Sequence, residues 1–108
     1  MIKITANNFE EAVLRSEKPV LVEFYAPWCV YCRRIGPAYE KIAGQLEAEL
    51  TVGTVHYDEQ PELIERFGVE VIPTLMLFRE GVVLGSVVAP GSKAEIEEFI
   101  RRTLSERE

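Results

Sequence analysis

The distribution of hydrophobic residues along the chain predicts five strands. The apolar runs that suit strands cover residues 2–5, 19–26, 51–58, 74–78 and 82–88. The second run, PVLVEFYA, is apolar at nearly every position, which is typical of a strand buried on both faces. Only Arg79, Glu80 and Gly81 separate the last two runs, so we expect these strands to form a hairpin.

Apolar residues at helical spacing predict four helices between and after these strands. The residues expected to begin them are Asn7 or Asn8, Pro61 and, as a capping box, Ser92 with Glu95. The longest helix follows the only two cysteines and contains Pro37, which should kink it. The predicted apolar positions are Phe9, Val13, Leu14, Ile35, Tyr39, Ile42, Ala43, Leu46, Leu50, Ile96, Phe99, Ile100 and Leu104.

Strands that alternate with helices indicate an α/β fold. Crossover helices imply parallel pairing and the late hairpin adds antiparallel strands, so we expect a central mixed sheet with helices on both faces. The length of 108 residues suits a single domain over residues 1–108. A domain of this size buries a core without disulfides, so the cysteines are not needed for folding.

Charge and hydropathy narrow the classes of partner. A net charge of -6 argues against non-specific binding to nucleic acid or to anionic membranes. No apolar run approaches the ~20 residues that span a bilayer. The start of the chain, MIKITANNFEEAV, lacks the plan of a signal peptide. We therefore expect a cytoplasmic protein, a monomer, in which a cysteine pair is catalytic or metal-binding rather than structural.

The function of the pair Cys29 and Cys32 has three possible interpretations. A structural zinc site needs four ligands, and the chain offers these two cysteines and one histidine, His56, so only two chains together could complete it. A structural disulfide would close a very short loop and contribute little stability. The third interpretation, thiol–disulfide exchange, is favoured because the pair lies between a buried strand and a helix.

The position of the pair gives the exchange interpretation a physical basis. At the start of a helix, unpaired N–H groups and the helix dipole favour a negative charge on Cys29. The thiolate is the form that attacks a disulfide. Cys32 lies nearly one helical turn further on, so its sulfur should lie beside the first. We expect Cys29 to be the exposed nucleophile and Cys32 the shielded resolving thiol.

Motifs on both sides of the cysteines extend the pattern. They are VEFYAPWCVYC, Pro37, Asp58 before Pro61, FGVEVIPTLMLF and Gly81. On these residues the chain resembles the thioredoxin family, from about residue 2 to about residue 105. The resemblance implies the thioredoxin fold and thiol–disulfide exchange on protein substrates. No bound cofactor is expected, because a dithiol itself carries two electrons.

The resemblance also implies a set of substrate-binding residues. Pro73 matches the cis-proline of the family, although the pattern alone also fits a trans proline at the start of an edge strand. Its neighbours would expose backbone groups to a substrate strand. The lone Trp28 is either a core residue or an apolar shelf for docking, and we favour the shelf. The full set is Trp28, Val30, Tyr31, Ile72, Pro73, Thr74 and Ala89, where Ala89 replaces a family glycine.

Glu23 is the one charged residue in the buried strand run. Burial should raise its pKa, and a neutral acid near Cys32 can give and take a proton. The family usually has Asp at this position and often has Lys at the position of Thr54. Without that cation, we expect a Glu23 pKa higher than in a relative that contains the lysine.

Val30 and Tyr31 replace the Gly-Pro that typical members of the family have between the cysteines. The N–H of Tyr31, which proline lacks, should act as an added donor to the Cys29 thiolate. A stabilised reduced form makes a stronger oxidant, so we expect a protein less reducing than a Gly-Pro relative.

The leading functional prediction is a protein-disulfide reductase. Cys29 is the predicted nucleophile, Cys32 the resolving thiol and Glu23 the proton-transfer group. The expected partners are disulfide-containing proteins and an electron donor like thioredoxin reductase. Two alternatives remain: a disulfide oxidase or isomerase outside the cytosol, and a thioredoxin-fold binding module whose cysteines are idle.

Overall fold

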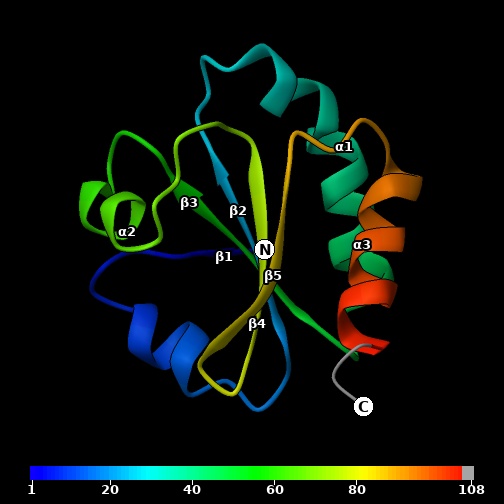
Figure 1. Ribbon diagram of the computed structural model, residues 1–108, viewed down its shortest axis with the longest axis horizontal. Coiled ribbons are helices and arrows are strands. Elements are labelled where there is room, and N and C mark those ends of the chain that lie inside the picture. The colour runs from blue at the N-terminus through cyan, green and yellow to red at the C-terminus, as the bar shows by residue number, and fades with distance from the viewer. Residues whose placement is uncertain (106–108) are drawn as a thin grey trace.

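The computed structural model describes residues 1–105 and contains a five-stranded sheet in the order β1-β3-β2-β4-β5 (Figure 1). Its strands are β1 (Ile2–Lys3), β2 (Val20–Tyr25), β3 (Thr51–His56), β4 (Thr74–Arg79) and β5 (Val82–Val88). β3 pairs in parallel with β1 and β2, whereas β4 pairs antiparallel with β2 and β5. The predicted mixed sheet is confirmed.

Helices cover both faces of this sheet. α1 (Val30–Gln45) and α3 (Lys93–Ser105) lie together on one face, at the right of Figure 1. The short η1 (Glu10–Leu14), a π-helix, and α2 (Pro61–Arg66) cover the other face. Among the described residues, no helix combines the length and apolar character needed to cross a bilayer.

β2 lies at the centre of the sheet and contributes to both cores. Val20, Val22 and Phe24 pack in the core under η1 and α2. Leu21 points to the opposite face, into the core under α1 and α3. Because side chains alternate along a strand, Glu23 faces α1 as Leu21 does. This register brings a carboxyl group under the helix that contains the cysteines.

Several element boundaries differ from those predicted. β1 contains only Ile2 and Lys3 of the predicted run 2–5. The predicted asparagine cap is wrong: Phe9 is the N-cap of η1. The Asn8 side chain is already engaged, because it accepts from Thr5 N–H at 2.8 Å and donates to Lys3 O at 2.9 Å.

The other predicted helix signals are mostly confirmed. α1 runs through Pro37 without interruption but ends at Gln45, so Leu50 lies outside the helix, although it is buried in the same core. Ser92 Oγ accepts from Glu95 N–H at 3.2 Å, as a capping box requires. The Glu95 carboxylate accepts from Gly91 N–H rather than from the N–H of Ser92.

Three loops converge at the end of the sheet where β2 leads into α1, at the top of Figure 1. They join β2 to α1, α2 to β4, and β5 to α3. A hydrogen bond from Ala89 N–H to Pro73 O, 2.8 Å long, links the second loop to the third. The candidate site lies among these loops.

Candidate active site

Cys29 is the N-cap residue of α1, with φ -83° and ψ 117°. Its Sγ accepts a hydrogen bond from Cys32 N–H at 3.2 Å, so the first turn of the helix directs an amide at the sulfur. The thiol in turn lies 3.7 Å from Ile72 O, to which it donates. The sulfur therefore lies where the unpaired N–H groups at the start of α1 point.

The predicted exposure of Cys29 is wrong. Its exposed fraction is 6%, against 5% for Cys32, so both cysteines are buried. Both cysteines form a buried cluster with Ala26, and Tyr25, Tyr57 and Ile72 pack against this cluster from three different segments. The two free thiols therefore differ in their neighbours rather than in their accessibility.

Cys32 is the thiol that resists ionisation. Its burial, and secondly its hydrogen bond with Cys29, raise the pKa of Cys32 to about 12. A thiol in this state is a poor nucleophile near neutral pH, because only the thiolate attacks. If Cys32 is to react, a nearby base must first remove its proton.

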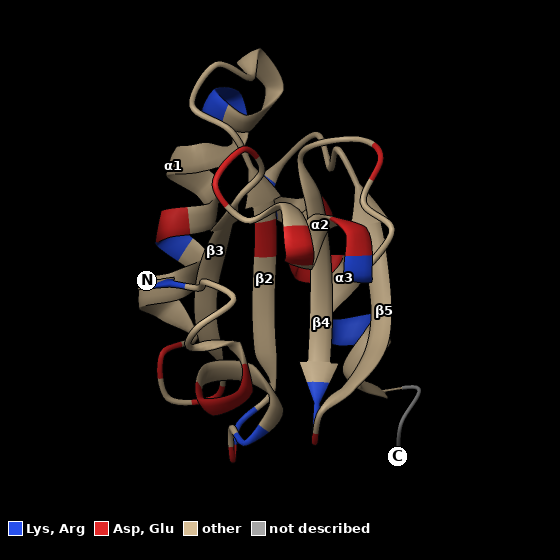
Figure 2. Cartoon of the chain, turned by 90° about the vertical axis from the view of Figure 1, so that its left-hand side faces the viewer, with Lys and Arg blue, Asp and Glu red and all other residues tan. Residues whose placement is uncertain are grey.

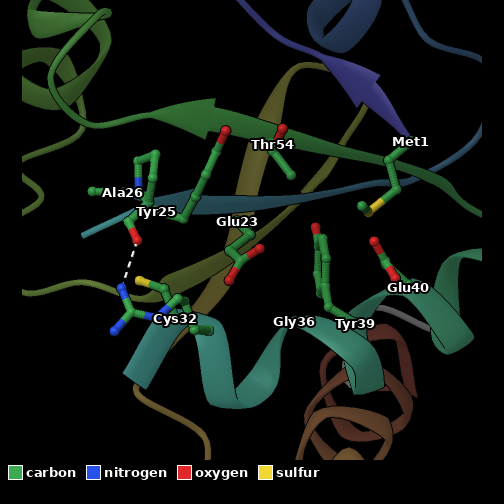
Figure 3. A pocket seen from close by; sticks show the side chains of 11 residues that line it. Met1, Glu23, Tyr25, Ala26, Cys32, Gly36, Tyr39, Glu40 and Thr54 are labelled. Atoms are coloured by element: carbon green, nitrogen blue, oxygen red, sulfur yellow. Dashed lines mark hydrogen bonds between the residues drawn. The ribbon is translucent and has the colours of Figure 1, made fainter. Parts of the chain in front are cut away.

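Glu23 and Cys32 line the same cavity of about 280 Å³ (Figure 3). The close-up shows the Glu23 carboxyl group between Cys32 and Tyr39, on the side of β2 that faces α1. Glu23 is 5% exposed, and its Oε2 atom has no hydrogen-bond partner in the part of the chain that the structure describes. Burial raises the pKa of this carboxyl group from its ordinary 4.5 to about 7, which confirms the predicted direction.

Thr54 lies beside Glu23 in the register between β2 and β3, and it lines the same cavity. A hydroxyl-bearing side chain cannot balance a buried negative charge as an ammonium group does. The comparison with a lysine-containing relative stays a prediction.

Tyr39 is a site residue that the sequence pattern placed only in the apolar stripe. Its hydroxyl lies 2.8 Å from Gly53 O and 3.1 Å from Leu21 O, so one proton is shared between carbonyls of β3 and β2. Burial, and secondly the charge of Glu23, raise the Tyr39 pKa well above its ordinary value. Tyr39 therefore stays neutral beside the carboxyl group. A tyrosine among aliphatic stripe positions is the only signal that could have indicated this role.

On the other side of the cysteines lies a groove of about 340 Å³. Its lining consists of Tyr31, Arg34, Ile35, Val71, Ile72, Ala89, Pro90 and Gly91. Of the predicted substrate-binding residues it thus includes Tyr31, Ile72 and Ala89, while Trp28, Val30, Pro73 and Thr74 are not in the lining.

The remaining predicted residues lie outside the lining of this groove. The Ile72–Pro73 peptide bond is cis, as the resemblance implied. Thr74 is buried, and its hydroxyl donates to Val71 O. Trp28 is 60% exposed, so it is not a core residue, and its Nε1 donates to Asp58 Oδ2 at 2.7 Å. Trp28 therefore presents an exposed aromatic surface next to Cys29 in the chain, as the docking-shelf interpretation requires.

Ala89 adopts a positive φ of 45°. This left-handed conformation favours glycine, because a Cβ there crowds the following carbonyl. The alanine is thus accommodated with strain in the loop that donates to Pro73 O.

The structure does not support the predicted role of the Tyr31 amide. The donor to Cys29 Sγ among the described residues is Cys32 N–H, which lies one residue further along α1. This donor does not depend on the residue types at positions 30 and 31. The hydrogen bonds therefore give no reason for a less reducing protein.

Two adjacent thiols, one held at the start of a helix and the other next to a buried base, can open a disulfide and then close one of their own. This chemistry defines the class of thiol–disulfide oxidoreductases. The family model described as Thioredoxin matches residues 1–102.

Curated relatives agree with this class. The chain is 39% identical to Thioredoxin from Rickettsia bellii over 101 residues, which cover 94% of this chain and 96% of that protein. It is 37% identical to Thioredoxin 1 from Nostoc sp. over 102 residues, or 94% and 95% of the two chains. Thioredoxin from Porphyra purpurea is 32% identical over 103 residues, or 95% and 96%. The chain belongs to the thioredoxin family.

Proposed function

We propose that this protein reduces disulfides in other proteins through Cys29 and Cys32. The observation that supports this most is the Cys32 N–H directed at Cys29 Sγ, beside a groove that could receive a substrate segment. The Cys29 thiolate attacks one sulfur of the substrate disulfide. An S–S bond forms between protein and substrate, and the second substrate sulfur leaves as a thiolate that takes up a proton.

Cys32 then completes the exchange. Glu23 in its carboxylate form takes the proton of Cys32, either directly or through a water molecule in their shared cavity. The Cys32 thiolate attacks Cys29 Sγ, which forms the Cys29–Cys32 disulfide and releases, as a thiolate, the substrate sulfur that was bonded to Cys29. This thiolate takes up the proton that Glu23 accepted from Cys32, and the thiolate released in the first step takes its proton from solvent. The substrate has then gained two electrons and two protons.

Apolar side chains around the site suit the docking of a protein surface. Trp28, Val30, Tyr31, Val71 and Val88 are each at least half exposed. Backbone groups of Ile72 and Thr74 would pair with an extended substrate segment next to this surface. We assign substrate binding to this rim, and proton transfer to Glu23, as parts of the proposal.

The oxidised protein must be reduced again by an external donor, which we propose to be a reductase of the thioredoxin reductase type in the cytoplasm. The oxidase alternative was supported by the predicted hydrogen bond from the Tyr31 amide to Cys29, and the observed donor is Cys32 N–H instead. The other alternative, a binding module whose cysteines are idle, is distinguished from a reductase by the insulin assay described next.

Reduction of insulin disulfides, followed by turbidity with dithiothreitol as the donor, tests the proposal. The wild type should accelerate precipitation, and Cys29→Ser should abolish the acceleration. Reduced Cys32→Ser mixed with insulin in the absence of dithiothreitol should instead accumulate a mixed disulfide, visible as a mass increase that later addition of dithiothreitol reverses. A wild type no faster than Cys29→Ser would refute the proposal. Equilibration with glutathione buffers then separates reductant from oxidant.

A further inference from the structure

The groove beside Cys29 carries one charged side chain. Its lining is apolar or small except for Arg34. Ile72, whose carbonyl accepts from the Cys29 thiol, belongs to this lining, so the groove that contains Arg34 adjoins the reacting thiol through Ile72. A segment that entered the groove would meet the guanidinium group near its own disulfide.

Arg34 is held in place without its charge being neutralised. Its Cζ atom lies 5.5 Å from the centre of the Tyr31 ring, three residues earlier on α1. Within residues 1–105 it forms no ion pair and no side-chain hydrogen bond. Stacking on an aromatic ring orients a guanidinium group while leaving its donors available.

No acid among residues 1–105 forms an ion pair with Arg34. Glu95 lies next to the lining, where its carboxylate accepts from Gly91 N–H, but it is not paired with the guanidinium group. The net charge of -6 opposes acidic partners at long range. Salt screens distant charges beyond about 10 Å at 0.1 M, however, whereas a contact with Arg34 is much shorter.

Building on the proposed function, we propose that Arg34 makes the protein prefer disulfides in segments that have an acidic side chain next to the reacting cysteine. The carboxylate of the segment accepts from the guanidinium group while the disulfide approaches Cys29. An exposed charge pair of this kind corresponds to a preference of about two- to fivefold in rate.

Arg33 provides a matched control. It follows Cys32 directly, and its Nη1 donates to Pro27 O at 2.8 Å. It lines the Glu23 cavity and not the groove. A charge reversal at either arginine changes the net charge by the same amount, so only a local effect can distinguish the two variants.

The test uses two disulfide-linked peptides that differ only in a Glu or a Lys next to the cysteine. Reduced wild type, Arg34→Glu, Arg34→Gln and Arg33→Glu are mixed with each peptide, and the second-order rate constant of disulfide reduction is measured. Each rate is divided by the rate with dithiothreitol, which removes the intrinsic effect of the neighbouring charge on the disulfide.

The wild type should favour the Glu peptide, and about 0.5 M salt should reduce the preference. Arg34→Glu should reverse it, Arg34→Gln should abolish it, and Arg33→Glu should retain it. Equal shifts of the peptide preference in Arg34→Glu and Arg33→Glu would overturn the inference, as would the absence of a preference in the wild type. In either case, reduction of both peptides would still support the proposed function. If neither peptide were reduced, the proposed function itself would fail.

Discussion

Replacing Glu23 by glutamine should stabilise the protein, and increasingly so as the pH rises. A pKa raised from 4.5 to about 7 means that ionising this buried carboxyl group costs about 3 kcal/mol, since each tenfold change in acidity corresponds to about 1.4 kcal/mol. Below pH 4.5 the group is protonated in both the folded and unfolded states, so the penalty is absent.

Between pH 4.5 and 7 the unfolded chain loses this proton first, so the wild type loses stability as the pH rises. Above pH 7 the full penalty of about 3 kcal/mol applies. Glu23→Gln removes the titrating group and keeps the shape of the side chain. Its advantage in the free energy of unfolding should therefore grow from near zero at low pH to about 2–3 kcal/mol at pH 8.

Urea denaturation of the reduced proteins at several pH values measures this difference. Glu40→Gln is the matched control, because Glu40 is an exposed acid in the lining of the same cavity. It should shift stability little at any pH. If the advantage of Glu23→Gln were the same at pH 5 and pH 8, burial would not be the cause of the raised pKa.

Three further predictions concern neighbouring residues. Thr54→Lys places an ammonium group beside Glu23, so the carboxyl pKa measured by NMR titration should fall from about 7 toward its ordinary 4.5. Ala89→Gly relieves the positive φ of 45° and should raise the free energy of unfolding by about 0.5–1 kcal/mol in urea titrations. Tyr39→Phe leaves two buried carbonyls without their shared donor, so the same titrations should show a loss of about 1–2 kcal/mol. An unchanged NMR titration, or unchanged urea midpoints, would contradict the respective argument.

Burial of Glu23 could be predicted from the sequence because the information is local. A single acid interrupts the run VLVEFY, and strand alternation decides which face it occupies. Glu23 is the only acid in β2, and Figure 2 shows it as the single red band on that strand. The mixed character of the sheet followed in the same way from the alternation of elements and the late hairpin, whereas the order of its strands was not predicted.

The cover over Cys29 could not be predicted in this way. Tyr57 and Ile72 pack against the cluster that contains Cys29 from loops that are distant in the sequence, and no periodicity encodes which loop residue packs there. The donor to Cys29 Sγ was misassigned for a similar reason. Whether the Tyr31 or the Cys32 amide points at an N-cap side chain depends on the geometry of the first turn, not on the residue types between the cysteines.

The cost of burying Glu23 is consistent with its proposed role. With a pKa of about 7, the carboxyl group is present in both forms near neutral pH, whereas Cys32, at about 12, is almost entirely protonated. A group in this state can accept the thiol proton during resolution and release it afterwards. An ordinary exposed glutamate is almost fully ionised at neutral pH, so it is a weaker base for this proton. Glu23→Gln should thus be both more stable and slower to resolve mixed disulfides. Quenched-flow mass spectrometry at pH 7 should show the mixed disulfide accumulating in Glu23→Gln. If this variant resolved the mixed disulfide at the wild-type rate, Glu23 would lower stability without contributing to proton transfer.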